Sequence, residues 1–294
     1  MSHVQELVDL LGLESIGVNR FRGHCQDLGF RNLFGGQVLG QSLSAASQTL
    51  PDGEWSPHSL HAYFLRAGNV IDTIEFEVEC VRDGRSFAMR QITASQKGKA
   101  ILKMMCSFQR PEEGFEHQDK MPEVKGPEGI LSQLELSRMF KDKFPDSVRD
   151  IFTAEKPIEI RTINPTNIFA PQKEEPIKHV WMKADAPLAD DPLQHASVLT
   201  YATDFNLIGA AMMPHGVSFY QKGMQVASLD HSIWFHRPVK IDEWLLYSID
   251  SPNASGGRGF SRGQIFNQKG ELVASVAQEG LIRKVDLSKK TDKK

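Results

Sequence analysis

The chain has 294 residues, 40% of them hydrophobic and 24% charged, which is typical of a globular protein with one or two domains. Its formal net charge of −3 provides no general attraction to nucleic acid or to anionic membranes. No apolar stretch approaches the length needed to span a bilayer. We therefore expect neither a nucleic-acid partner nor a membrane span.

The start of the chain and its cysteines favour a cytoplasmic location. Residues 1–7 are acidic and amphipathic, and they lack the basic and apolar regions of a secretion signal. The three cysteines, Cys25, Cys80 and Cys106, are widely separated and form no CxxC pair, so neither a disulfide framework nor a zinc site is expected. Reduced thiols are typical of cytoplasmic proteins.

The first predicted helix covers residues 35–46 and contains three glycines. Glycine in a helix interior costs about 1 kcal/mol relative to alanine, so we expect these small residues where the helix must lie close against a sheet. The segment 50–53, which contains a proline and a turn pair, is the predicted stop signal.

Three strand-like runs follow this helix. Residues 73–80 alternate between polar and apolar side chains, as a half-exposed strand does. The Asp-Gly pair at 83–84 predicts a hairpin turn before a strand at 87–95. The Lys-Gly pair at 97–98 predicts a second turn before a strand at 101–108. Together these runs predict an antiparallel meander.

A connecting segment separates two predicted units. Residues 110–128 are rich in proline, glutamate and glycine, which is typical of a linker, and residues 130–144 have the pattern of an amphipathic helix. We therefore predict a first unit at 1–110, a linker with a helical segment at 111–157, and a second unit at 158–294.

The second unit is predicted to have the same order, one helix followed by strands. Asp191 is an N-cap candidate and Pro192 suits the first helical position, and the helix is expected to run through Asp204 to a stop at 214–216. The strands expected after it cover residues 244–249, 259–266 and 272–282. Each unit thus combines one long helix with an antiparallel meander, and this arrangement indicates an α+β fold.

The most informative feature of the sequence is a repeat between the two units. The repeated segments are 84–92 with 257–265 and 96–98 with 268–270. Superposing them places Cys106 opposite Gln278 and Ser44 opposite Asp204. Core positions of a duplicated unit normally stay alike, because both copies must pack. A carboxylate and a carboxamide opposite small residues therefore indicate a polar site in the second unit alone.

Asp204, Ser228 and Gln278 are the candidate site residues. Asp204 interrupts a largely apolar helix face and Gln278 interrupts an apolar strand face, where an unpaired polar group is costly. Taken singly, each has a structural alternative: a solvated carboxylate, an ordinary strand serine, and a buried amide that joins two strands. Together they supply a proton acceptor, a hydroxyl and an amide, which could hold and polarise one water molecule.

Other kinds of catalytic motif are missing from the sequence. It contains no GxGxxG or GxxxxGK[ST] loop, no HExxH and no GxSxG, so we expect no nucleotide cofactor, no metal ion and no serine nucleophile. His58 is a rival general base by residue type, and it is the weaker choice because it lies outside the site-bearing unit. His231 and His236 are interpreted as structural or surface residues.

Several segments resemble the acyl-CoA thioesterase II family. They are 203–205, 228–238 and 275–280 in the second unit, and 34–38 and 84–87 in the first. The resemblance covers nearly the whole chain in unbroken order. It implies a double hotdog fold, in which a sheet wraps each helix and the two sheets join into one. It also implies hydrolysis of fatty acyl-CoA to a free fatty acid and CoA.

The resemblance further implies roles for the site residues and a partner. The catalytic set of the family falls on Asp204, Ser228 and Gln278, with Asp204 as general base and the other two orienting the water. Two alternatives stay open: a non-catalytic acyl-CoA binding module, and a hotdog enoyl-CoA hydratase. The hydratase would need a histidine about one helical turn after Asp204, where this chain has Gly209. Exposed edge strands and the resemblance favour a homodimer or homotetramer.

Overall fold

The computed structural model describes residues 2–30 and 32–285, so residues 286–294 of the second predicted unit lie outside the described residues. The elements of the first half are α1 (His3–Leu11), β1 (Glu14–Gly17), β2 (Arg20–Gly23), α2 (Gly35–Ser47), β3 (Ser56–Phe64), β4 (Ile74–Asp83), β5 (Phe87–Gln96) and β6 (Lys99–Gln109). The connecting segment contains α3 (Gln133–Met139), η1 (Lys141–Lys143) and α4 (Asp146–Thr153). Those of the second half are β7 (Ile158–Ile163), β8 (Ile177–Ala184), α5 (Pro192–Thr203), α6 (Leu207–Ala210), η2 (Met213–His215), β9 (Met224–Ser228), β10 (Asp230–Phe235), β11 (Leu245–Ser255), β12 (Arg258–Asn267) and β13 (Leu272–Lys284).

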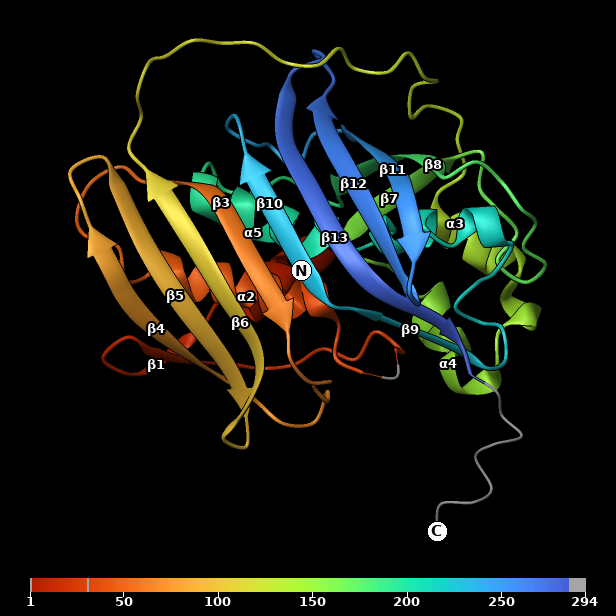
Figure 1. Ribbon diagram of the computed structural model, residues 1–294, viewed down its shortest axis with the longest axis horizontal. Coiled ribbons are helices and arrows are strands. Elements are labelled where there is room, and N and C mark those ends of the chain that lie inside the picture. Colours follow the sequence, from red (N-terminus) through yellow and green to blue (C-terminus); the bar gives the residue numbers. More distant parts are fainter. Residues whose placement is uncertain (1, 31, 286–294) are drawn as a thin grey trace.

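The strands of the described chain form one antiparallel sheet in the order β1-β2-β4-β5-β6-β3-β10-β13-β12-β11-β8-β7, and β9 pairs with β13 beside it. β3 and β10 pair at the centre, and equivalent strands follow in the same order on either side (Figure 1). Two strands therefore precede the helix of each half, whereas the sequence predicted the helix first. β1 and β2 have four residues each, which is too short for a clear alternation pattern.

The repeat found in the sequence is present in the hydrogen-bond register. The equivalent bonds are Leu65 N–H to Ile101 O at 2.8 Å and His236 N–H to Val273 O at 2.9 Å. Cys106 and Gln278 each lie five positions beyond the accepting residue of their own half. The register therefore agrees with the superposition of the two sequence segments, and Cys106 occupies the position equivalent to Gln278.

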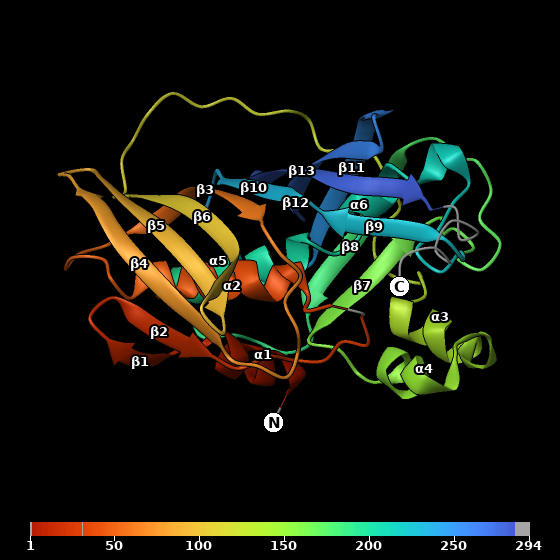
Figure 2. The same cartoon turned by 60° about the horizontal axis from the view of Figure 1, so that its bottom comes forward.

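α2 and α5 lie side by side on one face of the sheet (Figure 2). Their contact requires glycine, because a Cβ atom on Gly36 would overlap the carbonyl oxygen of Tyr201, and one on Gly40 would lie 3.0 Å from that of Ser197. The glycines of α2 thus allow a close approach to the other helix, where the sequence predicted a close approach to a sheet. Two helices held against one continuous antiparallel sheet are the double hotdog arrangement that the resemblance implied.

The long helix predicted for the second unit ends early. α5 ends at Thr203, with Asp204 as its C-cap. Asn206 then takes a left-handed conformation, φ 69°, which interrupts the helix, so that α6 is a separate short turn. The half-buried Lys178 holds this interruption in place, because its Nζ donates to Asn206 Oδ1 at 2.6 Å.

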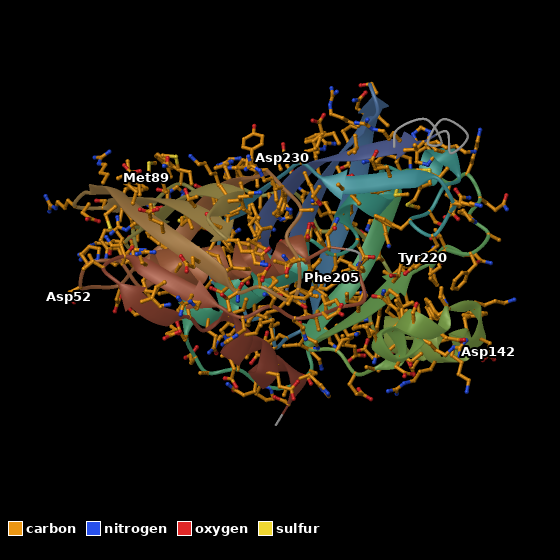
Figure 3. The ribbon with its side chains drawn as sticks, turned by 90° about the horizontal axis from the view of Figure 1, so that it is seen from below. Asp52, Met89, Asp142, Phe205, Tyr220 and Asp230 are labelled. Carbon is orange, nitrogen blue, oxygen red and sulfur yellow. The ribbon has the colours of Figure 1, made fainter. Side chains whose placement is uncertain are left out.

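Residues 110–128, predicted as a linker, contain no helix or strand and pass over one edge of the molecule between the halves (Figure 1). They are fixed in part by Trp181, whose Nε1 donates to Lys125 O at 2.8 Å. The single helix predicted at 130–144 is instead α3 followed by η1, because the backbone leaves the helical conformation at Phe140. α4 was not predicted, and it packs against α3, which contacts β7 at one end of the sheet (Figure 3).

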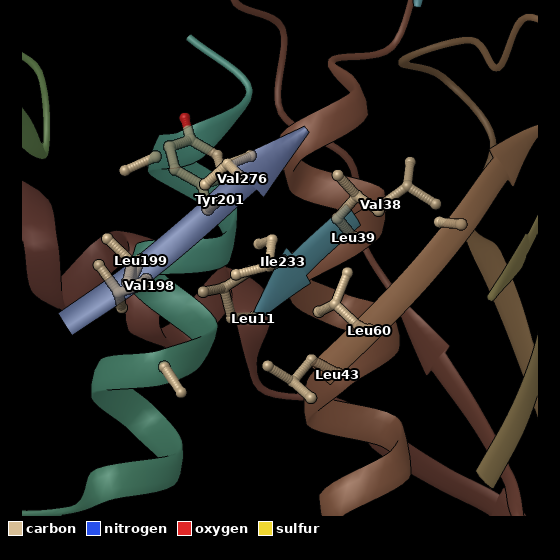
Figure 4. Close-up of a cluster of buried hydrophobic side chains, with 14 of the residues drawn as sticks. Leu11, Val38, Leu39, Leu43, Leu60, Val198, Leu199, Tyr201, Ile233 and Val276 are labelled. Atoms are coloured by element: carbon tan, nitrogen blue, oxygen red, sulfur yellow. The ribbon is translucent and has the colours of Figure 1, made fainter. Parts of the chain in front are cut away.

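The main hydrophobic core lies between the central helices and the sheet, and both halves contribute to it. Its buried side chains include Leu39, Leu43, Leu60, Leu199, Ile233 and Val276 (Figure 4). β6 ends at Gln109 and β7 begins at Ile158, and we propose units at 1–110 and 158–294 joined by the linker at 111–157. None of the described helices is long and apolar enough to cross a membrane.

Candidate active site

Asp204 lies beside the N-terminus of α2, in the opposite half of the molecule. Its Oδ2 accepts the Gly36 N–H at 2.8 Å, and its side chain is only 6% exposed. α2 has no side-chain cap of its own, because its N-cap residue is Phe34. Asp204 therefore caps this helix from 168 residues away along the chain. The positive end of the helix in turn stabilises the carboxylate.

Gln278 and Ser228 approach the same carboxyl group from β13 and β9. Gln278 is 1% exposed, and its Nε2 donates to Asp204 Oδ1 at 3.0 Å. Ser228 ends β9 opposite Gly280 of β13. Its hydroxyl is close enough to lower the pKa of Asp204, although its influence is weaker than that of Gln278. The fold thus brings together the three residues predicted from the sequence.

The pKa of Asp204 is set by opposing effects. Burial is the largest influence and raises the pKa above that of an exposed aspartate. The hydrogen bonds from Gln278 and Gly36 and the nearby Ser228 hydroxyl, named in decreasing order of their influence on the pKa, lower it and offset part of this effect. A carboxylate with a raised pKa is a stronger base than an exposed one. The group is therefore suited to accept a proton from water.

Aromatic side chains lie near this carboxyl group. A Cβ atom on Gly35 would lie 2.8 Å both from Asp204 Oδ2 and from the ring of Phe64, so only glycine fits between them. Phe205 follows Asp204 and stacks on Phe34 with 4.3 Å between ring centroids. Figure 3 shows Phe205 near the middle of the molecule, between the two halves. The rings keep the carboxyl group in an apolar setting, which strengthens its electrostatic interactions.

His231, which was predicted to be structural or on the surface, is fully buried beside Asp204. Its Nδ1 lies 4.0 Å from Asp204 Oδ1, and its Nε2 lies 3.0 Å from Thr203 Oγ1. Burial lowers the pKa of His231 to about 3, so the ring is neutral. The repeat contains the signal that could have identified it. Leu60, which pairs with Cys106, occupies the equivalent position in the first half.

The rival base His58 lies far from this site. It is near the start of β3, with its ring 5.5 Å from that of Phe87, whereas Phe64 at the other end of β3 borders Asp204. Six residues of extended strand span about 20 Å. His58 therefore does not act on a water molecule held by Asp204. Within residues 2–30 and 32–285, no group of three or more His, Cys, Asp or Glu side chains is placed to hold a metal ion.

Comparison with known proteins gives matches over most of the chain. The family described as acyl-CoA thioesterase matches residues 147–281, and the one described as acyl-CoA thioesterase N-terminal domain matches residues 26–109. A protein named acyl-CoA thioesterase 2 from Haemophilus influenzae is 44% identical over 280 residues, which cover 95% of this chain and 98% of that protein. The chain belongs to the acyl-CoA thioesterase II family.

Further relatives extend this similarity to human proteins and to solved structures. Human acyl-coenzyme A thioesterase 8 is 36% identical over 93% of this chain and 88% of its own length. The crystal structure of acyl-CoA thioesterase II TesB2 from Mycobacterium marinum is 39% identical, with a TM-score of 0.77 over 95% of this chain and 97% of that chain. A hot dog fold protein of unknown function from Alicyclobacillus acidocaldarius, 20% identical, has a TM-score of 0.75 over 95% of this chain and 98% of that chain. These structures confirm the predicted double hotdog fold.

Proposed function

We propose that this chain hydrolyses fatty acyl-CoA to a free fatty acid and CoA, with Asp204 as the general base. The observation that carries the proposal is the buried carboxyl group of Asp204, held by the Gly36 N–H and by the Gln278 amide. Relatives of this chain that are named acyl-CoA thioesterases support the same reaction.

In this mechanism Asp204 accepts a proton from a water molecule whose oxygen attacks the thioester carbonyl carbon. The water is oriented by the Ser228 hydroxyl and by the second hydrogen on Gln278 Nε2, since the first is donated to Asp204. Backbone N–H groups stabilise the oxyanion that forms. When the C–S bond breaks, the proton on Asp204 passes to the leaving thiolate. The products are the fatty acid and the CoA thiol, and no covalent intermediate forms on the enzyme.

Release of free thiol from palmitoyl-CoA tests this function. The proposal expects one equivalent of CoA thiol and one of palmitate for each equivalent of substrate consumed. A non-catalytic binding module would bind the substrate without releasing thiol. An enoyl-CoA hydratase would act only on an unsaturated acyl chain, and it would leave the thioester bond intact.

The rate of hydrolysis is expected to fall as the pH is lowered through the pKa of Asp204, because the protonated carboxyl group cannot accept a proton from water. Burial raises this pKa above the ordinary value for aspartate of 3.8, so the fall should begin at a higher pH than an exposed aspartate would give. This fall in rate is the acid limb of the pH–rate profile. Initial rates of thiol release across the acidic and neutral pH range measure it. An acid limb at or below the ordinary value would contradict the assignment of Asp204 as the base.

Replacing Cys106 with alanine is expected to leave the rate of thiol release nearly unchanged. Cys106 is 2% exposed, and burial raises the pKa of its thiol far above the ordinary value, so it is not a nucleophile. The loss of the sulfur should cost about 1 kcal/mol of unfolding free energy. Steady-state rates and urea unfolding measure the two effects. If the folded variant no longer turned over substrate, a thiol nucleophile would have to replace the activated water.

We also propose that the protein forms a homodimer or homotetramer. The β3–β10 pairing joins the two sheets within one chain, while β1 and β7 end the sheet and leave open edges that favour association. Tyr63, Met105 and Trp234 are also exposed on adjacent strands at the centre of the sheet, and exposed apolar side chains of this kind mark association surfaces. Light scattering should give a multiple of 33.0 kDa. An active monomer would contradict this assembly.

The location proposed for this enzyme is the cytoplasm. Cys25, Cys80 and Cys106 are all free thiols, which supports a reducing compartment.

A further inference from the structure

A continuous run of aromatic rings leads from the candidate active site to the connecting helices. From the site outward, its members are Phe205, Phe34, Phe30, Phe152 and Tyr220. The centroids of successive rings are 4.3 Å, 5.8 Å, 6.3 Å and 6.2 Å apart in that order, so each ring packs on the next. We call these five residues the aromatic run.

The aromatic run begins where the thioester must lie. Phe205 directly follows Asp204 in the sequence. Phe34 stands two positions before Gly36, whose N–H donates to Asp204. In the proposed reaction, the thioester carbonyl carbon must be within reach of the water that Asp204 activates. The first carbons of an acyl chain therefore lie close to the rings of Phe205 and Phe34.

α4 continues the aromatic run away from the site. A Cβ atom on Gly29 would lie 3.2 Å from the side chain of Ile151, so the segment 26–30 packs against α4. Gln37 fixes the start of this segment, because its buried Oε1 accepts the Gln26 N–H at 3.0 Å. Gln37 belongs to α2, the helix whose N-terminus contacts Asp204. The middle of the run is thus held in a defined place relative to the site.

Part of the aromatic run is open to solvent. Phe30 is 42% exposed, Tyr220 is 44% exposed, and Phe152 is half-buried. Phe169, which is 37% exposed, lies beside Tyr220 with 5.9 Å between ring centroids. Figure 3 shows Phe205 near the middle of the molecule and Tyr220 toward the end that holds α3 and α4. Large apolar side chains exposed together mark a binding surface, and here that surface is continuous with the site.

We propose that the aromatic run binds the acyl chain of the substrate and makes the enzyme selective for long chains. This inference rests on the proposed function and deepens it. With C–C bonds near 1.5 Å, an extended chain advances about 1.3 Å per carbon, so an octanoyl chain of about 9 Å ends near Phe30. A palmitoyl chain of about 19 Å passes Phe152 and reaches Tyr220. Only the longer chain contacts the outer half of the run.

Phe152→Ala and Tyr220→Ala test this assignment through chain-length selectivity. The measured quantity is the ratio of kcat/KM for palmitoyl-CoA to kcat/KM for octanoyl-CoA, with both substrates below their micelle concentrations. Each fully buried methylene group is worth about fourfold in binding, so each variant should lower the ratio about 5- to 20-fold. A contact made equally in the ground state and the transition state acts on KM, and we expect KM for palmitoyl-CoA to carry most of the change.

Conservative variants and a distant aromatic residue provide the controls. Phe152→Leu and Tyr220→Phe keep an apolar side chain of similar size, and they should keep the native ratio within about twofold. Phe87→Ala is the matched control, because Phe87 is 41% exposed but lies beside His58 in the first half. It should leave the ratio unchanged. Since Tyr220 is exposed, Tyr220→Ala provides the test even if Phe152→Ala does not fold.

A binding measurement separates failure of this inference from failure of the proposed function. Asp204→Asn serves as the background, because it does not consume the substrate. Adding Tyr220→Ala should weaken the binding of palmitoyl-CoA about 5- to 20-fold more than that of octanoyl-CoA. If the wild-type protein releases no thiol, the proposed function fails, and this measurement still decides the acyl-chain site. Unchanged ratios in both experiments would overturn the site even in an active enzyme.

Two other occupants of the aromatic run would give different results. If it bound a lipid surface, Tyr220→Ala would reduce cosedimentation with phosphatidylcholine vesicles. If it bound a second copy of the chain, Tyr220→Ala would lower the mass measured by light scattering. Either result, together with an unchanged chain-length ratio, would overturn the proposal.

Discussion

Replacing Asp204 with asparagine is expected to reduce the rate of thiol release by about 10²- to 10⁴-fold, the usual contribution of a general base. Asparagine has the size of aspartate and can still accept the Gly36 N–H, so the start of α2 should remain capped. It cannot take a proton from water. Steady-state kinetics with palmitoyl-CoA measure the loss, and circular dichroism confirms the fold.

Asp230→Asn is the matched control for this experiment. Asp230 is a half-buried carboxylate whose pKa is also raised by burial, but its Oδ1 accepts the Glu279 N–H at 2.6 Å and has no part in the proposed reaction. The control should keep the rate within a few-fold of the native value. If the folded Asp204→Asn protein retained more than a few per cent of the native rate, Asp204 would not be the base.

Gly36→Ala is expected to damage both stability and catalysis. The added Cβ atom would overlap the backbone carbonyl oxygen of Tyr201, which cannot move unless α5 moves. Overpacking of this kind typically costs about 1–3 kcal/mol of unfolding free energy. Separating α2 from α5 would also withdraw the Gly36 N–H from Asp204, raise the pKa of the carboxyl group and move the acid limb to higher pH. Urea unfolding and the pH–rate profile measure these effects.

Gly209→Ala provides the comparison within a neighbouring helix. A Cβ atom there would meet no other atom within 4 Å, so the unfolding free energy should change by less than about 1 kcal/mol. Should Gly36→Ala prove as stable and as active as Gly209→Ala, the close packing of α2 on α5 would not control the position of Asp204.

Much of the fold could be predicted because its signals are local in the sequence. The strands at 73–80, 87–95 and 101–108 were recognised from alternation and from turn pairs, and they correspond to β4, β5 and β6. The helix at 35–46 was recognised from its small residues and its stop signal. Short strands such as β1 carry too few residues for the same reasoning.

The sequence also predicted the candidate site residues, through the repeat and the family resemblance. A repeat compares positions that share an environment, so Gln278 stood out against Cys106. The same comparison sets His231 against Leu60, yet a histidine near an apolar run has ordinary structural roles, and His231 was set aside for that reason.

By itself, the sequence therefore determined the family, the double hotdog fold and the residue types of the site. Only the tertiary structure decided how Asp204 is held. Its carboxyl group accepts an N–H from Gly36, 168 residues away, and it lies at the end of α5 because Asn206 interrupts the helix. Contacts between such distant residues follow from the packing of α2 on α5. Local propensity does not encode that packing, because it depends on atoms that meet only after the chain has folded.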